Sequence, residues 1–238
     1  MSDAASGTTA PFTLTTRHGQ RLVGAIDYPA GDAPVARTLI LCHGYGGDMA
    51  GRYLRQIAAT LGADGVATVR FDFTNGAGTS DGELRDASVS GYADDLDDVL
   101  DFVRARPRLR AGTFAIGGHS YAGMPIIVVA ARRRDIAGVF FLAAVFDRTS
   151  EFAMADVAAR VVAPIVIVMA GADREVAATQ ADALVRAAGE RVVARVTIPG
   201  ADHNFTAPGS ASALADAILA RLPAPPPSAA PTATPPAR

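Results

Sequence analysis

One serine of the sequence stands between two apolar runs, in a stretch of unusually small residues. The first run, Thr113–Ile116, ends in two glycines; Ser120 comes next but one, and a second apolar run covers Met124–Ala131. This pattern predicts a strand, a very tight turn and a helix, with the hydroxyl of Ser120 exposed at the apex as a nucleophile. The alternative is an ordinary strand-to-helix turn in which the serine caps the helix.

The other two residue types that a serine nucleophile needs follow it in the chain. A serine hydroxyl is unreactive at neutral pH until a base takes its proton, and a carboxylate orients that base. Asp173 follows the apolar run 164–170, and His203 follows the last apolar run, 192–198. If these runs are parallel strands of one sheet, Ser120, Asp173 and His203 lie on loops at the same edge.

Three other histidines compete for the role of the base. His18 lies in a predicted hairpin turn, away from that sheet edge. His119 directly precedes the serine and is expected to point away from it. His43 begins the loop after an earlier strand. Only His203 follows the final strand, in a loop of polar and small residues, so it is the predicted base.

The elements that position these residues alternate along the chain. The periodicity of the apolar residues and the residues typical of turns predict a hairpin over Phe12–Tyr28, followed by strands separated by helices. The strands are expected at 38–42, 66–71, 113–116, 136–144, 164–170 and 192–198, and the helices at 50–61, 90–106, 124–131, 149–162, 176–188 and 210–222. The alternation predicts an α/β fold: a mostly parallel sheet with an N-terminal antiparallel hairpin and helices on both faces.

The two ends of the chain differ in composition from the part between them. Residues 1–10 are small and polar and are expected to be a disordered leader, with no apolar segment typical of a signal peptide. Residues 11–222 are predicted to form a single α/β domain. Residues 223–238 consist of Pro, Ala, Ser and Thr with almost no charge, which predicts a disordered tail.

Composition excludes several classes of function. The chain has 238 residues, half of them hydrophobic, and a formal net charge of −2. Charges of both signs are interspersed, so we expect no nucleic-acid partner. The single cysteine, Cys42, excludes an internal disulfide. No apolar run is long enough to span a membrane, and the expected location is the cytoplasm.

Several motifs of this chain resemble the α/β-hydrolase superfamily. They read CHGYGG at 42–47, FDFTNGAGTSDGE at 71–83 and GGHSYAG at 117–123, followed late in the chain by GAD at 171–173 and DHNF at 202–205. The resemblance covers about residues 12–222 and is greatest to small bacterial esterases of the feruloyl/cinnamoyl type and their serine-aminopeptidase-like relatives. One departure is Ala122, which stands where the serine motif usually has its last glycine.

The resemblance implies an α/β-hydrolase fold and a Ser120–His203–Asp173 triad. It also implies that His43 is a structural histidine supporting the loop that follows it. Some superfamily members carry the acid after the preceding strand, which makes Asp147 the rival of Asp173. Asp173 is preferred because it follows the more usual strand and sits in a family-like Gly-Ala-Asp-Arg sequence.

An acyl-transferring serine also needs an oxyanion hole, which consists of two preorganised N–H donors. The backbone N–H of Tyr121 is one candidate, because it follows the nucleophile at the start of a helix. The backbone N–H of Tyr45 is the other, in a loop whose glycines let the chain turn its amides toward the site. An ordinary turn tyrosine is the alternative for Tyr45.

The length of one gap limits what can cover the site. Larger members of the superfamily insert tens of residues between two late strands, but Ala144 and Pro164 leave room here for one short helix. The sequence therefore predicts a minimal cap and an open, shallow site, without the insertion of feruloyl esterases. Candidate apolar lining residues are Tyr45, Tyr121, Phe146, Phe152 and Phe205, each of which could equally be core.

The leading hypothesis is a serine hydrolase that cleaves small carboxylic esters through an acyl-enzyme. A peptidase or thioesterase with the same triad is the alternative, because the fold does not decide the scissile bond. An inactive binding or scaffold protein is the alternative from another class. No cofactor is expected, the spacing of His, Cys, Asp and Glu suggests no metal site, and the loop Asn75–Gly78 lacks a full dinucleotide-binding motif.

Overall fold

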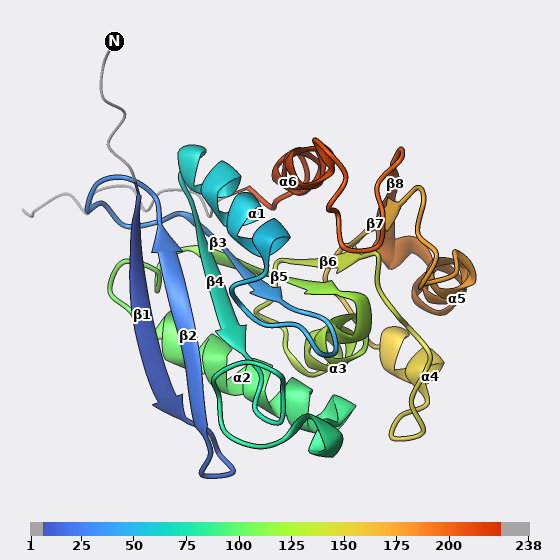
Figure 1. Cartoon of the computed structure of the whole chain (residues 1–238), viewed down its shortest axis with the longest axis horizontal. Coiled ribbons are helices and arrows are strands. Elements are labelled where there is room, and N and C mark those ends of the chain that lie inside the picture. Colours follow the sequence, from blue (N-terminus) through green and yellow to red (C-terminus); the bar gives the residue numbers. More distant parts are fainter. Residues whose placement is uncertain (1–6, 225–238) are drawn as a thin grey trace, which may run out of the picture.

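A computed structural model describes residues 7–224 as one eight-stranded sheet with helices on both faces (Figure 1). The strands lie in the order β1-β2-β4-β3-β5-β6-β7-β8. Their bounds are β1 Thr8–Thr15, β2 Arg21–Tyr28, β3 Arg37–Cys42, β4 Val66–Asp72, β5 Thr113–His119, β6 Gly138–Leu142, β7 Ile165–Ala170 and β8 Val192–Ile198. The predicted α/β fold is confirmed.

The antiparallel part of the sheet is confined to its N-terminal edge. β1 pairs with β2 as a hairpin and β2 pairs antiparallel with β4, whereas every later pairing is parallel. The hairpin register begins at Thr8 opposite Tyr28, so residues 8–10 belong to β1 and not to the expected leader. They are a strand because β2 is long enough to pair with them. The predictions for residues 1–6 and 225–238 lie outside the described residues.

The helices form one layer on each face of the sheet (Figure 1). α1 packs against α6 on one face, and α2, α3, α4 and α5 contact one another in sequence on the other. Their bounds are α1 Arg52–Ala63, α2 Val89–Arg104, α3 Gly123–Arg132, α4 Met154–Ala158, α5 Thr179–Ala188 and α6 Ser210–Leu219. None of the helices within residues 7–224 has the length and apolarity that a membrane crossing requires.

The central strands are buried on both faces, because each face of the sheet is covered by a layer of helices. In β3 the side chains alternate between two cores: Ile40 and Cys42 face α2 and α3, whereas Leu39 and Leu41 face α1 and α6. Cys42 is fully buried, and burial raises the pKa of its thiol. It therefore remains a neutral core residue.

The segment between β6 and β7 is less helical than the sequence indicated. A helix was expected over 149–162, but α4 covers only Met154–Ala158. The residues before it serve another element: the carboxylate of Glu151 accepts hydrogen bonds from the backbone N–H groups of Val89 and Ser90, at 2.8 and 2.9 Å. A carboxylate bound to the first amides of α2 stabilises that helix start. The segment is thus a short anchored loop, consistent with the minimal cap.

Candidate active site

Ser120 occupies the sharp turn between β5 and α3. Its φ is +53°, a left-handed conformation that is uncommon for a residue with a side chain. The turn is tight because glycines flank it: a Cβ at Gly118 would lie 2.6 Å from the carbonyl oxygen of Ala122, and one at Gly123 would lie 2.5 Å from that of Val145. Ala122 itself fits and is fully buried, so the departure from the usual motif leaves the turn intact.

A continuous hydrogen-bonded chain joins Ser120, His203 and Asp173. The Nδ1 of His203 lies 2.8 Å from Asp173 Oδ2, and its Nε2 lies 2.9 Å from Ser120 Oγ. A carboxylate can only accept, so Nδ1 carries the proton and Nε2 is free to accept from the serine hydroxyl. The structure therefore brings together the three residues that the sequence selected, from the loops after β5, β7 and β8.

Asp173 is held in its orientation by its own loop. Its Oδ1 accepts hydrogen bonds from the backbone N–H groups of Glu175 and Val176, at 2.8 and 2.9 Å. Burial alone would raise the pKa of Asp173, but the hydrogen bonds from Val176, His203 and Glu175 together lower it below the ordinary value. The carboxylate is therefore ionised at neutral pH. The rival, Asp147, is exposed, and its backbone N–H donates to Gln180.

The loop that carries Tyr45 approaches the serine closely. A Cβ at Gly44 would lie only 2.8 Å from Ser120 Cβ, so glycine is required there. Gly46 follows with φ +71°, and the backbone N–H of Gly47 donates to the carbonyl of Gly44 at 3.1 Å, so the chain makes a tight turn here. Tyr121 is in the short 3-10 turn Ser120–Ala122, whose first amides have no partner within the turn. The amides of Tyr45 and Tyr121 thus belong to segments that border Ser120 from two sides.

His43 links this loop to the next strand. Its Nδ1 donates to the carbonyl of Gly44 at 2.8 Å, and its Nε2 accepts from the backbone N–H of Phe73 at 3.3 Å. Burial lowers the pKa of His43, which keeps the ring neutral and able to make both bonds. His18 lies elsewhere, beside Asp94 of α2.

The role of His119 was missed by the sequence analysis. Instead of turning away from the site, its Nε2 donates to the backbone carbonyl of His203 at 2.8 Å. Its Nδ1 lies 3.0 Å from the hydroxyl of Tyr53, which donates to it. Burial lowers the pKa of His119 to about 4, so the ring is neutral at physiological pH. The sequence signal was a polar residue that ends a strand and directly precedes the serine.

The site opens into two adjoining hollows that share Tyr45, Ser120, Glu175 and His203. One, of about 300 Å³, extends along the glycine loop to Asp48. The other, of about 410 Å³, is further lined by Tyr121, Val145, Arg148 and Val176. Glu175 is 63% exposed, and its Oε2 lies 3.8 Å from His203 Nε2. Within residues 7–224, no cluster of His, Cys, Asp or Glu has the arrangement of a metal site.

Two of the expected lining residues belong to the core. Phe146 and Phe205 are each only 2% exposed, and they pack in the cores on opposite faces of the sheet. Tyr45 and Tyr121 do border the hollows, with their ring centroids 5.6 Å apart. Within residues 7–224, the phenylalanine and tyrosine rings that line the two hollows are those of Tyr45, Tyr121 and Tyr53. Phe152 lines neither hollow and packs against the core.

Two comparisons with known proteins find matches, one to a family model and one to solved structures that share the fold. Residues 33–157, which are 125 of the 238, match the family model described as serine aminopeptidase, S33. We find no similar sequence among curated proteins.

Several solved structures share the fold at low sequence identity. Est1E from Butyrivibrio proteoclasticus, solved with ferulic acid bound, has a TM-score of 0.75 at 19% identity, over 87% of this chain and 96% of its own. Dienelactone hydrolase from Anabaena variabilis has a TM-score of 0.73 at 20% identity, over 92% of this chain and 100% of its own. An α/β serine hydrolase homologue from Coxiella burnetii has a TM-score of 0.73 at 24% identity, over 90% of this chain and 97% of its own.

Proposed function

This chain belongs to the serine aminopeptidase S33 family of serine hydrolases, and on that premise we propose that it cleaves small carboxylic esters through an acyl-enzyme intermediate. The single observation that carries the proposal is the hydrogen-bonded chain from Asp173 through His203 to Ser120, with both contacts below 3.0 Å. In this proposal Ser120 is the nucleophile, His203 the general base and Asp173 the residue that orients it.

In the acylation step, His203 Nε2 takes the hydroxyl proton while Ser120 Oγ attacks the carbonyl carbon of the ester. The carbonyl electron pair moves onto its oxygen, which forms a tetrahedral oxyanion. The intermediate then expels the alkoxide, which receives the proton from Nε2 and leaves as the alcohol. Water attacks the acyl-serine in the same way, with His203 again as the base, and the acid is released.

The proposed oxyanion hole consists of the backbone N–H groups of Tyr45 and Tyr121. Its support is the close approach of the glycine loop to Ser120 and the position of Tyr121 at the start of the short turn. Donors fixed in advance stabilise the developing charge without reorganisation, and removing one typically costs about 3 kcal/mol of transition-state stabilisation. No cofactor enters the mechanism, and the location that we propose is the cytoplasm.

The open site supports small or short-acyl substrates. The segment between β6 and β7 contains one five-residue helix, so no large cap encloses a long acyl chain. The description of the matched family favours a peptidase as the second candidate, and a thioester would react by the same steps.

A panel of p-nitrophenyl esters, thioesters and aminoacyl p-nitroanilides tests this function, with Ser120→Ala as the matched control. We expect turnover of short-chain esters by the wild-type protein and none above background by the variant, with unchanged melting temperature. Preference for the anilides would favour the peptidase, and failure on every substrate would favour an inactive scaffold.

A further inference from the structure

The loop that carries Tyr45 is fastened at its far end through one residue, Met49. The backbone N–H of Met49 donates to Asp72 Oδ1 at 2.7 Å, and its carbonyl accepts from Arg70 Nη1 at 2.6 Å. Asp72 and Arg70 are 2% and 7% exposed, and both belong to β4. The peptide units on the two sides of Met49 are thus each hydrogen-bonded to a buried charged side chain.

Asp72 is itself fixed by the glycine-rich loop that follows it. Its Oδ2 accepts from Thr79 N–H at 2.7 Å and from Thr79 Oγ1 at 3.0 Å. A Cβ at Gly78 would lie 2.1 Å from the carboxyl carbon of Asp72, so the loop wraps the carboxylate as closely as a backbone can. Gly78 therefore lets this loop close over a buried carboxylate, which accounts for part of a motif that the proposed mechanism does not use.

Arg70 is fixed from the opposite side. Asp27 of β2 accepts two of its hydrogen bonds, from Nε at 2.7 Å and from Nη2 at 3.0 Å. This two-point pairing determines the plane of the guanidinium, so that Nη1 points at the carbonyl of Met49. β4 thereby fixes the end of the Tyr45 loop at Met49, and His43 fixes its beginning at Gly44.

We propose that Asp72 and Arg70 are positioning residues that act through Met49 to hold the Tyr45 amide in register with Ser120. This inference rests on the proposed function, in which the Tyr45 amide is an oxyanion donor. Five residues separate His43 and Met49, and three of them are glycines, two of which are next to Tyr45. Within the loop one backbone hydrogen bond, from Gly47 N–H to the carbonyl of Gly44 at 3.1 Å, closes a turn. Because so many of its residues are permissive, the position of this turn relative to Ser120 depends on how the two ends of the loop are held. A shift of about 1 Å at such a donor can cost about a hundredfold in rate.

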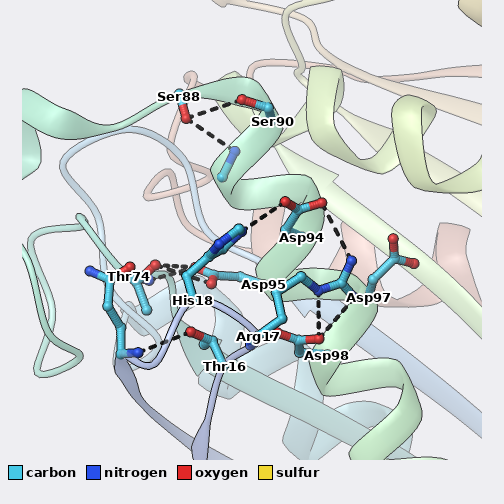
Figure 2. Close-up of polar contacts among 12 residues, drawn as sticks. Thr16, Arg17, His18, Thr74, Ser88, Ser90, Asp94, Asp95, Asp97 and Asp98 are labelled. Atoms are coloured by element: carbon cyan, nitrogen blue, oxygen red, sulfur yellow. Dashed lines mark hydrogen bonds and ion pairs between the residues drawn. The ribbon is translucent and has the colours of Figure 1, made fainter.

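The chain offers a matched control for Asp72. Asp95 of α2 is also buried, and its carboxylate accepts from Thr74 N–H at 2.7 Å and from Thr74 Oγ1 at 2.8 Å, as Figure 2 shows. Asp72 makes the same pair of bonds with Thr79. The difference is that Asp72 also binds the amide of Met49, whereas Asp95 binds Thr74 alone.

The test compares Asp72→Asn with Asp95→Asn at pH 7.5. Both variants are normalised by active-site titration with a fluorophosphonate, and kcat/KM is measured on p-nitrophenyl acetate. Phenylboronic acid, which forms a tetrahedral adduct with a serine, reports on the oxyanion hole through its Ki. For Asp72→Asn we expect kcat/KM to fall by about ten- to a hundredfold and Ki to rise in proportion. For Asp95→Asn we expect both values within about twofold of wild type.

Equal kcat/KM in the two variants, or a loss of kcat/KM without a rise in Ki, would overturn the inference. If Asp72→Asn does not fold, Arg70→Lys decides in its place, because it keeps a charge facing Asp27 but lacks the planar group that reaches the Met49 carbonyl. The same coupled loss is expected there, and its absence would overturn the inference. Wild-type protein that neither labels nor turns over an ester would instead contradict the proposed function.

Discussion

Replacing His119 by leucine is expected to destabilise the protein by an amount that depends on pH. The histidine is buried, and it joins two polar groups, the carbonyl of His203 and the hydroxyl of Tyr53, at 2.8 and 3.0 Å. Leucine fills much of the same space but bonds to neither group. Each buried polar group left without a partner costs about 1–3 kcal/mol. At pH 8 we therefore expect a loss of about 2–6 kcal/mol in the free energy of unfolding.

The expected loss shrinks in acid because the wild-type protein has its own pH dependence. Burial lowers the pKa of His119 to about 4 in the folded protein, whereas an unfolded histidine titrates near 6.5. The unfolded chain therefore binds a proton first as the pH falls, and the wild type loses stability between about pH 6.5 and 4. This difference between the folded and unfolded pKa values corresponds to about 3 kcal/mol of stability. The leucine variant has no histidine at this position and does not lose that stability in acid.

Urea denaturation at pH 8, 6 and 4 measures this difference directly. Every other titrating group is common to both proteins, so its contribution cancels in the comparison. We expect the two unfolding free energies to converge as the pH falls. A difference that stays constant from pH 8 to pH 4 would refute the assignment of His119 as a buried neutral link.

Three further predictions concern single substitutions. Asp173→Asn is expected to lower kcat on p-nitrophenyl acetate by about 10⁴-fold, and a larger loss with Asp147→Asn would transfer the acid role to Asp147. Gly44→Ala puts a methyl carbon 2.8 Å from Ser120 Cβ, so steady-state kinetics should show a loss of about tenfold or more; unchanged kcat/KM would refute that close approach. Burial raises the pKa of Asp95 to about 6, so the contribution of Asp95 to wild-type stability should fall by up to about 3 kcal/mol as the pH rises from 4 to 6. Asp95→Asn should lack this contribution, so the difference between its free energy of unfolding and that of the wild type, measured by urea titration, should change between pH 4 and pH 6. A difference that stays constant would contradict the burial argument.

The positions of the site residues could be predicted because they depend on the order of elements. Apolar runs separated by amphipathic segments indicated the parallel sheet, and Ser120, Asp173 and His203 each follow such a run. Parallel strands bring their ends to one edge regardless of the details of packing. The order of the runs was therefore enough to bring these three residues together.

The contacts between loops could not be predicted in the same way. Asp72 binds an amide 23 residues before it in the chain, and His119 binds a carbonyl 84 residues after it. Nothing local in the sequence marks either pairing, because both depend on how neighbouring loops pack across the sheet edge. Phe146 and Phe205 were uncertain for a similar reason: a phenylalanine in a loop can face the core or the site, and only the packing decides.

The most direct test of the central claim is to find which residue reacts with a fluorophosphonate. The protein is labelled at neutral pH, digested and analysed by tandem mass spectrometry, with Ser120→Ala and His203→Ala treated in parallel. The account predicts one adduct, on Ser120, with none in the serine variant and much slower labelling in the histidine variant. An adduct on another residue, or labelling of Ser120 at the same rate without His203, would contradict it.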